Sequence, residues 1–228
     1  MKITARGATD AANIVLFWPE NLPDEGDAML ASDPIALVES LRDQGKLIWF
    51  LCDGDGEYTV AIFVRSLVPE DLMVHCRDEE RIPVLAVRGV GYFGGMEYMF
   101  KQYPKLLTKY PAMCEQVLTP EGTYAARVYR TEVPESLYES WLAAQAGVGA
   151  KRLWDIHGVI AAGAVASVFA MFLAFFFVPW TVWFCILAIA SALVVCAVAI
   201  SHTNWYKLVA RARVALEKSY PSYVVHLE

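Results

Sequence analysis

The sequence predicts an α+β domain followed by a two-helix transmembrane hairpin and a C-terminal amphipathic helix. Three observations predict this class. Residues 156–206 contain no Asp, Glu, Lys or Arg, a run of 51 residues in a chain of 228. Short β-branched and aromatic runs separated by turn residues fill most of the first 146 residues. Apolar residues recur at helical spacing after residue 204, with basic residues opposite them.

Residues 1–146 are the predicted α+β domain, which we place in the cytoplasm. Asp33 and Pro34 indicate the start of a helix that Gly45 ends, and Pro134 opens another. Weaker helical segments are expected at 94–103 and 104–110. The strand-like runs are KITAR, NIVLFW, KLIWFLC, EYTVAIFVR, DLMVHCRD, RIPVLAVRG and GTYAARVYRTE. Five to seven strands and two to three helices predict an antiparallel or mixed sheet.

Residues 159–201 form the predicted hairpin. Segments 159–178 and 181–200 each supply 20 uncharged residues, enough to cross a hydrocarbon core about 30 Å thick. Pro179 lies between them and disfavours helix at the residue before it. Segment 147–158 is expected to be a linker and membrane-entry segment. Residues 202–228 are expected to be a basic juxtamembrane helix and tail. The helix either continues the second span or lies on the membrane surface, and the final YVVHL fits a short strand or a disordered tail.

Basic residues predict the orientation of the hairpin. They flank both of its ends and are absent from its turn; they are Lys151, Arg152, Lys207, Arg211, Arg213 and Lys218. By the positive-inside rule both termini are cytoplasmic. The first 20 residues contain no signal-peptide core, because their longest apolar run covers only residues 14–18. We therefore expect a multi-pass protein of the inner membrane.

The charge of the chain divides at the hairpin. Residues 1–150 contain 13 Lys and Arg against 22 Asp and Glu, a net charge of −9, whereas residues 151–228 contain 6 against 3, a net charge of +3. An acidic domain does not favour nucleic acid as a ligand. It favours a basic protein partner. The expected contact residues are the loop acids Glu20, Asp24, Glu25 and Asp27, although such a loop is also typical of a solvent-exposed surface.

The first span carries small residues at helical spacing, which let two helix backbones approach closely. They are Gly158, Ala162, Gly163, Ala166 and Ser167. These residues favour packing against the second span, and they also fit oligomerisation or binding of a partner helix.

One sequence pattern suggests a cofactor. GVGYFG at 89–94 matches GxGxxG, the dinucleotide-binding motif. That motif requires a helix after it, which Pro104 and Pro111 interrupt, and a strand ending in an acid about 20 residues on. A glycine-rich turn is the better interpretation. The five cysteines form no CxxC pair, so we expect no zinc site, and we assign no catalytic, cofactor-binding or metal-binding residues.

Three functions remain open. The first is an inner-membrane-anchored, non-enzymatic protein-binding module; one specific version is an immunity-type protein that neutralises a bacterial toxin at the membrane. The second is an accessory or regulatory subunit of a membrane complex, which uses the hairpin to pack against other helices. The third is a membrane-bound enzyme that binds a nucleotide or lipid head group through the glycine-rich turn at 89–95.

Overall fold

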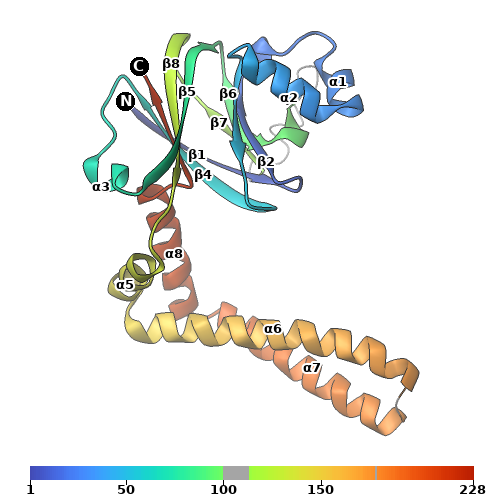
Figure 1. Cartoon of the computed structure of the whole chain (residues 1–228). Helices are drawn as coiled ribbons and strands as arrows, with labels where there is room; N and C mark the ends of the chain where they lie inside the picture. The colour runs from blue at the N-terminus through green and yellow to red at the C-terminus, as the bar shows by residue number, and fades with distance from the viewer. Residues whose placement is uncertain (100–112, 178) are drawn as a thin grey trace. The chain divides into compact units, whose positions relative to one another are not determined.

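The computed structural model describes residues 1–99, 113–177 and 179–228 (Figure 1). The chain divides into two compact units. The sheet unit comprises Met1–Val133 and Glu217–Glu228, and the helical unit comprises Pro134–Leu216. The helical segments expected at 94–103 and 104–110 fall, from residue 100 on, outside the described residues.

The sheet unit is built on one mixed sheet. Its nine strands in the described residues follow the order β3-β2-β6-β7-β1-β4-β9-β8-β5. All neighbours are antiparallel except β4 and β9, which are parallel. The strands are β1 Lys2–Thr9, β2 Asn13–Phe17, β3 Leu47–Leu51, β4 Gly56–Val64, β5 Cys76–Val87, β6 Gly91–Gly95, β7 Cys114–Val117, β8 Gly122–Thr131 and β9 Tyr223–Leu227.

The sheet curls until its two end strands nearly meet, so it forms an almost closed barrel. The amide of Ala86 in β5 donates to the carbonyl of Gly45, just before β3, at 2.8 Å. The sequence predicts an antiparallel or mixed sheet, and the parallel pair of β4 with β9 makes the sheet mixed. The sequence does not predict the near-closure, because contacts between residues 45 and 86 leave no local pattern.

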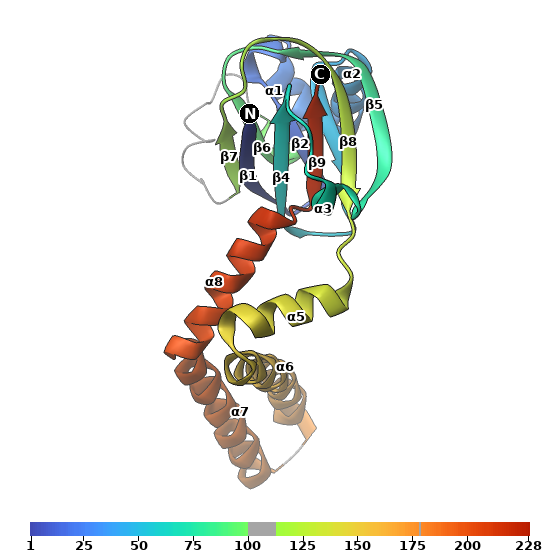
Figure 2. The same cartoon turned by 90° about the vertical axis from the view of Figure 1, so that its left-hand side faces the viewer.

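The last strand comes from the far side of the hairpin. β9 lies between β4 and β8 (Figure 2). Val225 pairs with Ile62 of β4 and with Val128 of β8. Of the two alternatives for YVVHL, the structure thus selects the strand. The segment 1–146 that the sequence outlines as a domain does not contain this strand.

Apolar side chains alternate between the two faces of the sheet. In β4, Val60 and Ile62 belong to the core inside the barrel, whereas Ala61 and Phe63 belong to an outer cluster. Helix α3 (Glu70–Met73) contributes Leu72 to that outer cluster. Helices α1 (Gly26–Ser32) and α2 (Pro34–Asp43) cover β2 and β3 from outside. Two short 3-10 turns complete this layer, η1 at Pro19–Asn21 and η2 at Met96–Tyr98.

The helical unit contains α5 Glu135–Ala146, α6 Val148–Phe177, α7 Trp180–Ser201 and the first part of α8 Asn204–Ser219. Figure 1 shows α6 and α7 side by side as a hairpin. Val148–Leu173 and Trp180–Ser201 are long and apolar enough to cross a membrane, and 6% of the apolar window of each is buried. The apolar side chains of both helices are therefore largely exposed, in contrast to those of the core helix of a soluble protein.

Two details of the helical unit differ from the sequence prediction or refine it. The expected linker at 147–158 is helical from Val148 on, and only Gly147, with φ of 86°, separates α5 from α6. Helix α8 does not continue α7, because the helical conformation is interrupted between Ser201 and Asn204. There Thr203 Oγ1 accepts from the amide of Tyr206 at 3.2 Å, as a helix N-cap does.

The described part of the chain contains seven α-helices. Four of them, α1, α2, α3 and α5, fall within residues 1–146, where the sequence predicts two to three. The predicted cap of α2 is confirmed, since Asp33 Oδ1 accepts from the amide of Ala36 at 3.1 Å. The amphipathic α8 is also confirmed, with Val209 and Ala212 buried.

Candidate functional site

The gap between the end strands β3 and β5, here called the seam, is closed at one end. Besides the bond from Ala86 to Gly45, the side-chain amide of Asn21 donates to the carbonyls of Lys46 at 3.1 Å and Ala86 at 2.8 Å. Asn21 is buried. A buried amide with both protons bonded holds the strand ends together, because leaving either proton unpaired would cost free energy.

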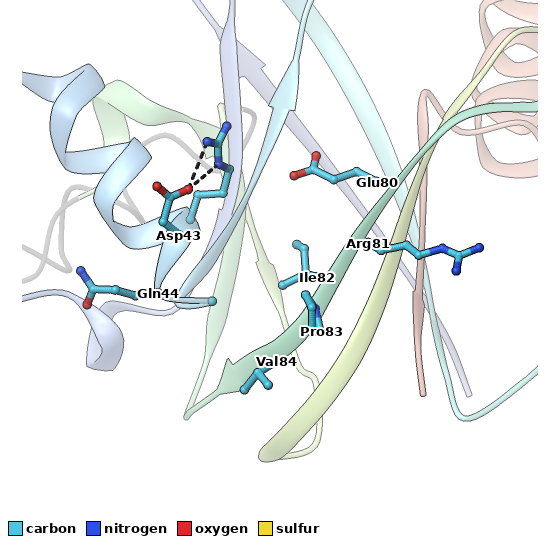
Figure 3. A pocket seen from close by; sticks show the side chains of 9 residues that line it. Asp43, Gln44, Glu80, Arg81, Ile82, Pro83 and Val84 are labelled. Atoms are coloured by element: carbon cyan, nitrogen blue, oxygen red, sulfur yellow. Dashed lines mark hydrogen bonds and ion pairs between the residues drawn. The ribbon is translucent and has the colours of Figure 1, made fainter.

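Two hollows follow the open part of the seam. One, of about 390 Å³, lies between the end of α2 and β5 and is lined by residues 42–45 and 80–84 (Figure 3). The other, of about 230 Å³, is lined by residues 49–51, Asp78, Glu80, Val128, Arg130 and Tyr223. Glu80 lines both hollows, and the two together are here called the seam groove.

The two walls of the seam groove differ in chemistry. Strand β3, LIWFL, has no charge and no proline. Strand β5 contains Pro83, and its pairing with β8 shifts register twice. At the first shift Asp78 adopts a left-handed conformation, with φ of 52°. Proline, charges and bulges are the features that protect an edge strand from pairing with another chain. The edge of β5 is therefore protected, and the edge of β3 is not.

Each arginine of the seam groove has an acidic partner. Arg42 bonds to Asp43, Arg130 pairs with Asp53, and Arg81 bonds to Glu79 at 2.6 Å. The bond from Arg81 lowers the pKa of the Glu79 carboxyl. The bond to Asp53 raises the pKa of Arg130.

The acids Asp78 and Glu80 make no ion pair within the described residues. In Figure 3, Glu80 points from β5 toward α2, whereas Arg81 points the other way. The lining of the seam groove contains three arginines and three acids, and the acids that make no ion pair within the described residues are Asp78 and Glu80.

A tyrosine forms the floor of the seam groove. The hydroxyl of Tyr223 donates to the carbonyl of Leu51 at 2.7 Å and lies 3.6 Å from the sulfur of Cys52. Burial raises the pKa of Tyr223 and also that of Cys52. A thiol with a raised pKa stays protonated at neutral pH and is a poor nucleophile. We therefore assign Cys52 a packing role beside Tyr223.

The sequence gives no indication of the seam groove. Its residues come from the end of α2 and from β3, β5, β8 and β9, and they are up to 181 residues apart in the chain, between Arg42 and Tyr223. Only the RDEER run at 77–81, with its excess of acid, marks one wall.

The predicted partner-binding acids lie on the segment that leads into α1. Glu20 belongs to η1, Asp24 and Glu25 precede α1, and Asp27 lies in its first turn. Glu20, Asp24 and Glu25 are exposed and Asp27 is half-buried. Among the described residues, no group of His, Cys, Asp or Glu side chains is arranged to hold a metal ion.

The glycines of the GVGYFG motif serve packing. Gly91 and Gly94 lie in β6, which pairs with β2 on one side and β7 on the other. A Cβ at Gly91 would lie 2.7 Å from Trp18 Nε1, and one at Gly94 would lie 2.7 Å from the carbonyl oxygen of Met113. With neighbours on both edges, this strand has no free row of amides to bind a phosphate.

The small residues of the first span fall on two faces of α6. Gly163 and Ser167 are half-buried, and a Cβ at Gly163 would lie 3.8 Å from Leu193 of α7. Gly158, Ala162 and Ala166 are exposed. The first face packs against the second span, and the second face is open.

Comparisons with known proteins identify no family for this chain. No family model and no curated protein matches the chain. A solved structure described as "Crocagin biosynthetic gene J" is similar with a TM-score of 0.36 and 16% identity, over 61% of this chain and 81% of that chain. A similarity of this size carries no argument about function.

Proposed function

We propose that the protein is an inner-membrane-anchored, non-enzymatic binding module whose sheet unit engages a protein partner on the cytoplasmic side. One observation supports it above the others. β8 precedes the hairpin, β9 follows it, and the two strands pair over residues 126–130 and 223–227. One sheet cannot lie on both sides of a bilayer. If α6 and α7 cross it, both ends of the hairpin must be on the side of the sheet unit.

Charge supports the choice of the cytoplasmic side and of a basic partner. The hairpin is flanked by basic residues on both ends, as the positive-inside rule requires of cytoplasmic flanks. The sheet unit contains 14 Lys and Arg against 22 Asp and Glu, a net charge of −8. Anionic lipid repels such a unit. A basic partner is attracted to it, and an immunity-type protein that neutralises a basic or membrane-acting toxin is one specific version of this function.

The two features that could support an enzyme, the glycine motif and the thiol of Cys52, are better explained by roles in packing. The glycine motif forms an inner strand of the sheet, and the thiol of Cys52 is protonated at neutral pH.

The test is capture of a partner by the tagged full-length protein. The protein is cross-linked in its native membrane, extracted in a mild non-ionic detergent and purified, and bound proteins are identified. We expect one basic protein in fixed ratio, released as the salt concentration rises above physiological strength, where the Debye length falls below about 8 Å. A partner that high salt does not release, or no stoichiometric partner, would contradict this function.

A second candidate function is an accessory subunit of a membrane complex. The open face of α6 formed by Gly158, Ala162 and Ala166 favours it, because small residues allow a partner helix to approach closely. Leucine at Ala162 should then release a co-purifying membrane protein, and leucine at the equally exposed Val165 should not.

A further inference from the structure

We propose that the seam groove binds an extended, basic segment of a partner protein, which adds to the sheet as a strand along the free edge of β3. This inference rests on the proposed protein-binding function and names the surface and the chemistry of the partner. Its three supports are the direction of the backbone groups of β3, the chemistry of the two edges, and the charge of the seam groove.

The backbone of β3 presents to the seam hydrogen-bonding groups that have no partner within the described residues. The carbonyl of Leu51 accepts from Tyr223, and the amide of its β2 partner Asn13 donates to Thr9 Oγ1, so this pair makes no ladder bond. Bonded and open pairs alternate in an antiparallel ladder. The pair of Trp49 with Val15 is therefore also open, and the amide and carbonyl of Trp49 point into the seam.

The apolar residues of the seam groove also lack a cover. Leu51 on β3 is 73% exposed and Val84 on β5 is 59% exposed. In an added strand, every second side chain would point to the same face and could cover Leu51 and Val84. The backbone of that strand would form hydrogen bonds to β3. Because Pro83 and the two register shifts prevent a regular ladder on β5, the pairing is assigned to β3 alone.

Charge selects the partner. The arginines of the seam groove are paired with acids, whereas Asp78 and Glu80 make no ion pair within the described residues. A lysine or arginine of the incoming strand would pair with them. A second copy of this chain is the other occupant to consider, but two sheet units of net charge −8 repel each other. The occupant is thus a basic segment of a different protein.

The experiment uses the full-length protein in a non-ionic detergent and a fluorescent seven-residue peptide of alternating valine and lysine. We expect saturable binding below about 1 mM, the weak end of specific recognition. Glutamate in place of lysine should abolish binding because it meets Asp78 and Glu80. Methylation of alternate backbone nitrogens should also abolish it, because it removes the amides that pair with β3.

Two pairs of variants locate the binding. Trp49→Pro removes the amide that points into the seam and leaves the ladder with β2 intact, as proline does on edge strands. Trp49→Ala removes the same side chain and keeps the amide. We expect the proline variant to bind at least about tenfold more weakly than the alanine variant. Asp78→Asn with Glu80→Gln should weaken binding at least about tenfold, because loss of even one of the two charged hydrogen bonds has this effect. Glu39→Gln with Glu70→Gln, two exposed acids on α2 and α3, should not.

Several outcomes would overturn the inference. The first is no binding of the lysine peptide below about 1 mM, and the second is equal affinity of the Trp49→Pro and Trp49→Ala variants for it. The third is equal affinity of the glutamate and lysine peptides for the protein. The fourth is a dimer of the protein that dissociates in the Trp49→Pro variant. The last would make a second copy the occupant. Folding of each variant is checked by protection of the buried Cys114 thiol. If the partner found by cross-linking binds Trp49→Pro as well as Trp49→Ala, the proposed function stands and the seam groove is not its site. If no partner is found while the peptide binds, only the proposed function fails.

Discussion

The strand that follows the hairpin should decide whether the sheet unit folds. In β9, the side chains of Tyr223, Val224, Val225 and Leu227 are buried, and the last three are fully buried. At about 1.5 to 3 kcal/mol per buried side chain, removal of β9 costs about 6 to 12 kcal/mol. A domain of this size is stable by about 5 to 15 kcal/mol in total. We therefore expect the fragment 1–146, which lacks β9, not to fold cooperatively.

A rejoined chain provides the control. The amide of Thr131 donates to the carbonyl of Ser222 at 2.9 Å, so the ends of β8 and β9 are adjacent. A chain of residues 1–133 and 217–228 joined by a flexible glycine-serine linker keeps the whole sheet unit and omits the hairpin. We expect this chain to be soluble and to unfold cooperatively in urea. In the same chain, Leu227→Ala should lower the free energy of unfolding by about 2 to 5 kcal/mol. The exposed Glu228→Ala should change it by less than about 1 kcal/mol.

The assay is the labelling rate of Cys114 by a maleimide. Cys114 is 2% exposed in β7, so it reacts only when the sheet opens. Cys52 and Cys76, the other thiols of the rejoined chain, are replaced by serine. If residues 1–146 protect Cys114 as well as the rejoined chain does, β9 is not required and the reasoning is refuted.

Four further predictions follow from the same structure. A reporter active only outside the cytoplasm should be silent when fused at Met1 or Glu228 and active at Pro179; activity at one terminus alone would contradict the shared sheet of β8 and β9. Gly91→Ala should destabilise the sheet unit by about 1 to 3 kcal/mol through its clash with Trp18, while Gly54→Ala, with open space around it, should not, as urea unfolding of the rejoined chain can measure. Burial raises the pKa of Cys114 from 9.0 to about 12, so the thiol loses its proton at lower pH in the unfolded chain than in the folded one. The free energy of unfolding, measured by urea titration, should therefore fall as pH rises from about 9 toward 12. Cys114→Ala should reduce this dependence on pH, and an unchanged dependence would exclude the thiol as its cause. In the hairpin, Ala164→Leu should reduce resistance to detergent unfolding because Ala164 is 6% exposed, whereas leucine at the exposed Ala166 should be tolerated, and equal effects would argue against the packing face.

The two long apolar helices, the cap of α2 and the amphipathic α8 could all be predicted from the sequence. Each depends on neighbours a few residues away. Residues 156–206 lack charge whatever they pack against, and Asp33 lies three residues from the amide that it caps. Such features are local, so the pattern of the chain is enough to predict them.

The near-closure of the sheet, the insertion of β9 and the seam groove depend on the tertiary structure. Tyr223 could belong to a tail as well as to a strand, because five alternating residues carry too little local preference to decide. Pairing with Val60 and Arg130, far away in the chain, decides it. The free edge of β3 likewise exists only because β3 and β5, the two end strands of the sheet, do not pair with each other. The sequence by itself determined which segments are apolar and long enough to cross a membrane, and only long-range pairing determined which strand edges of the sheet are left unpaired.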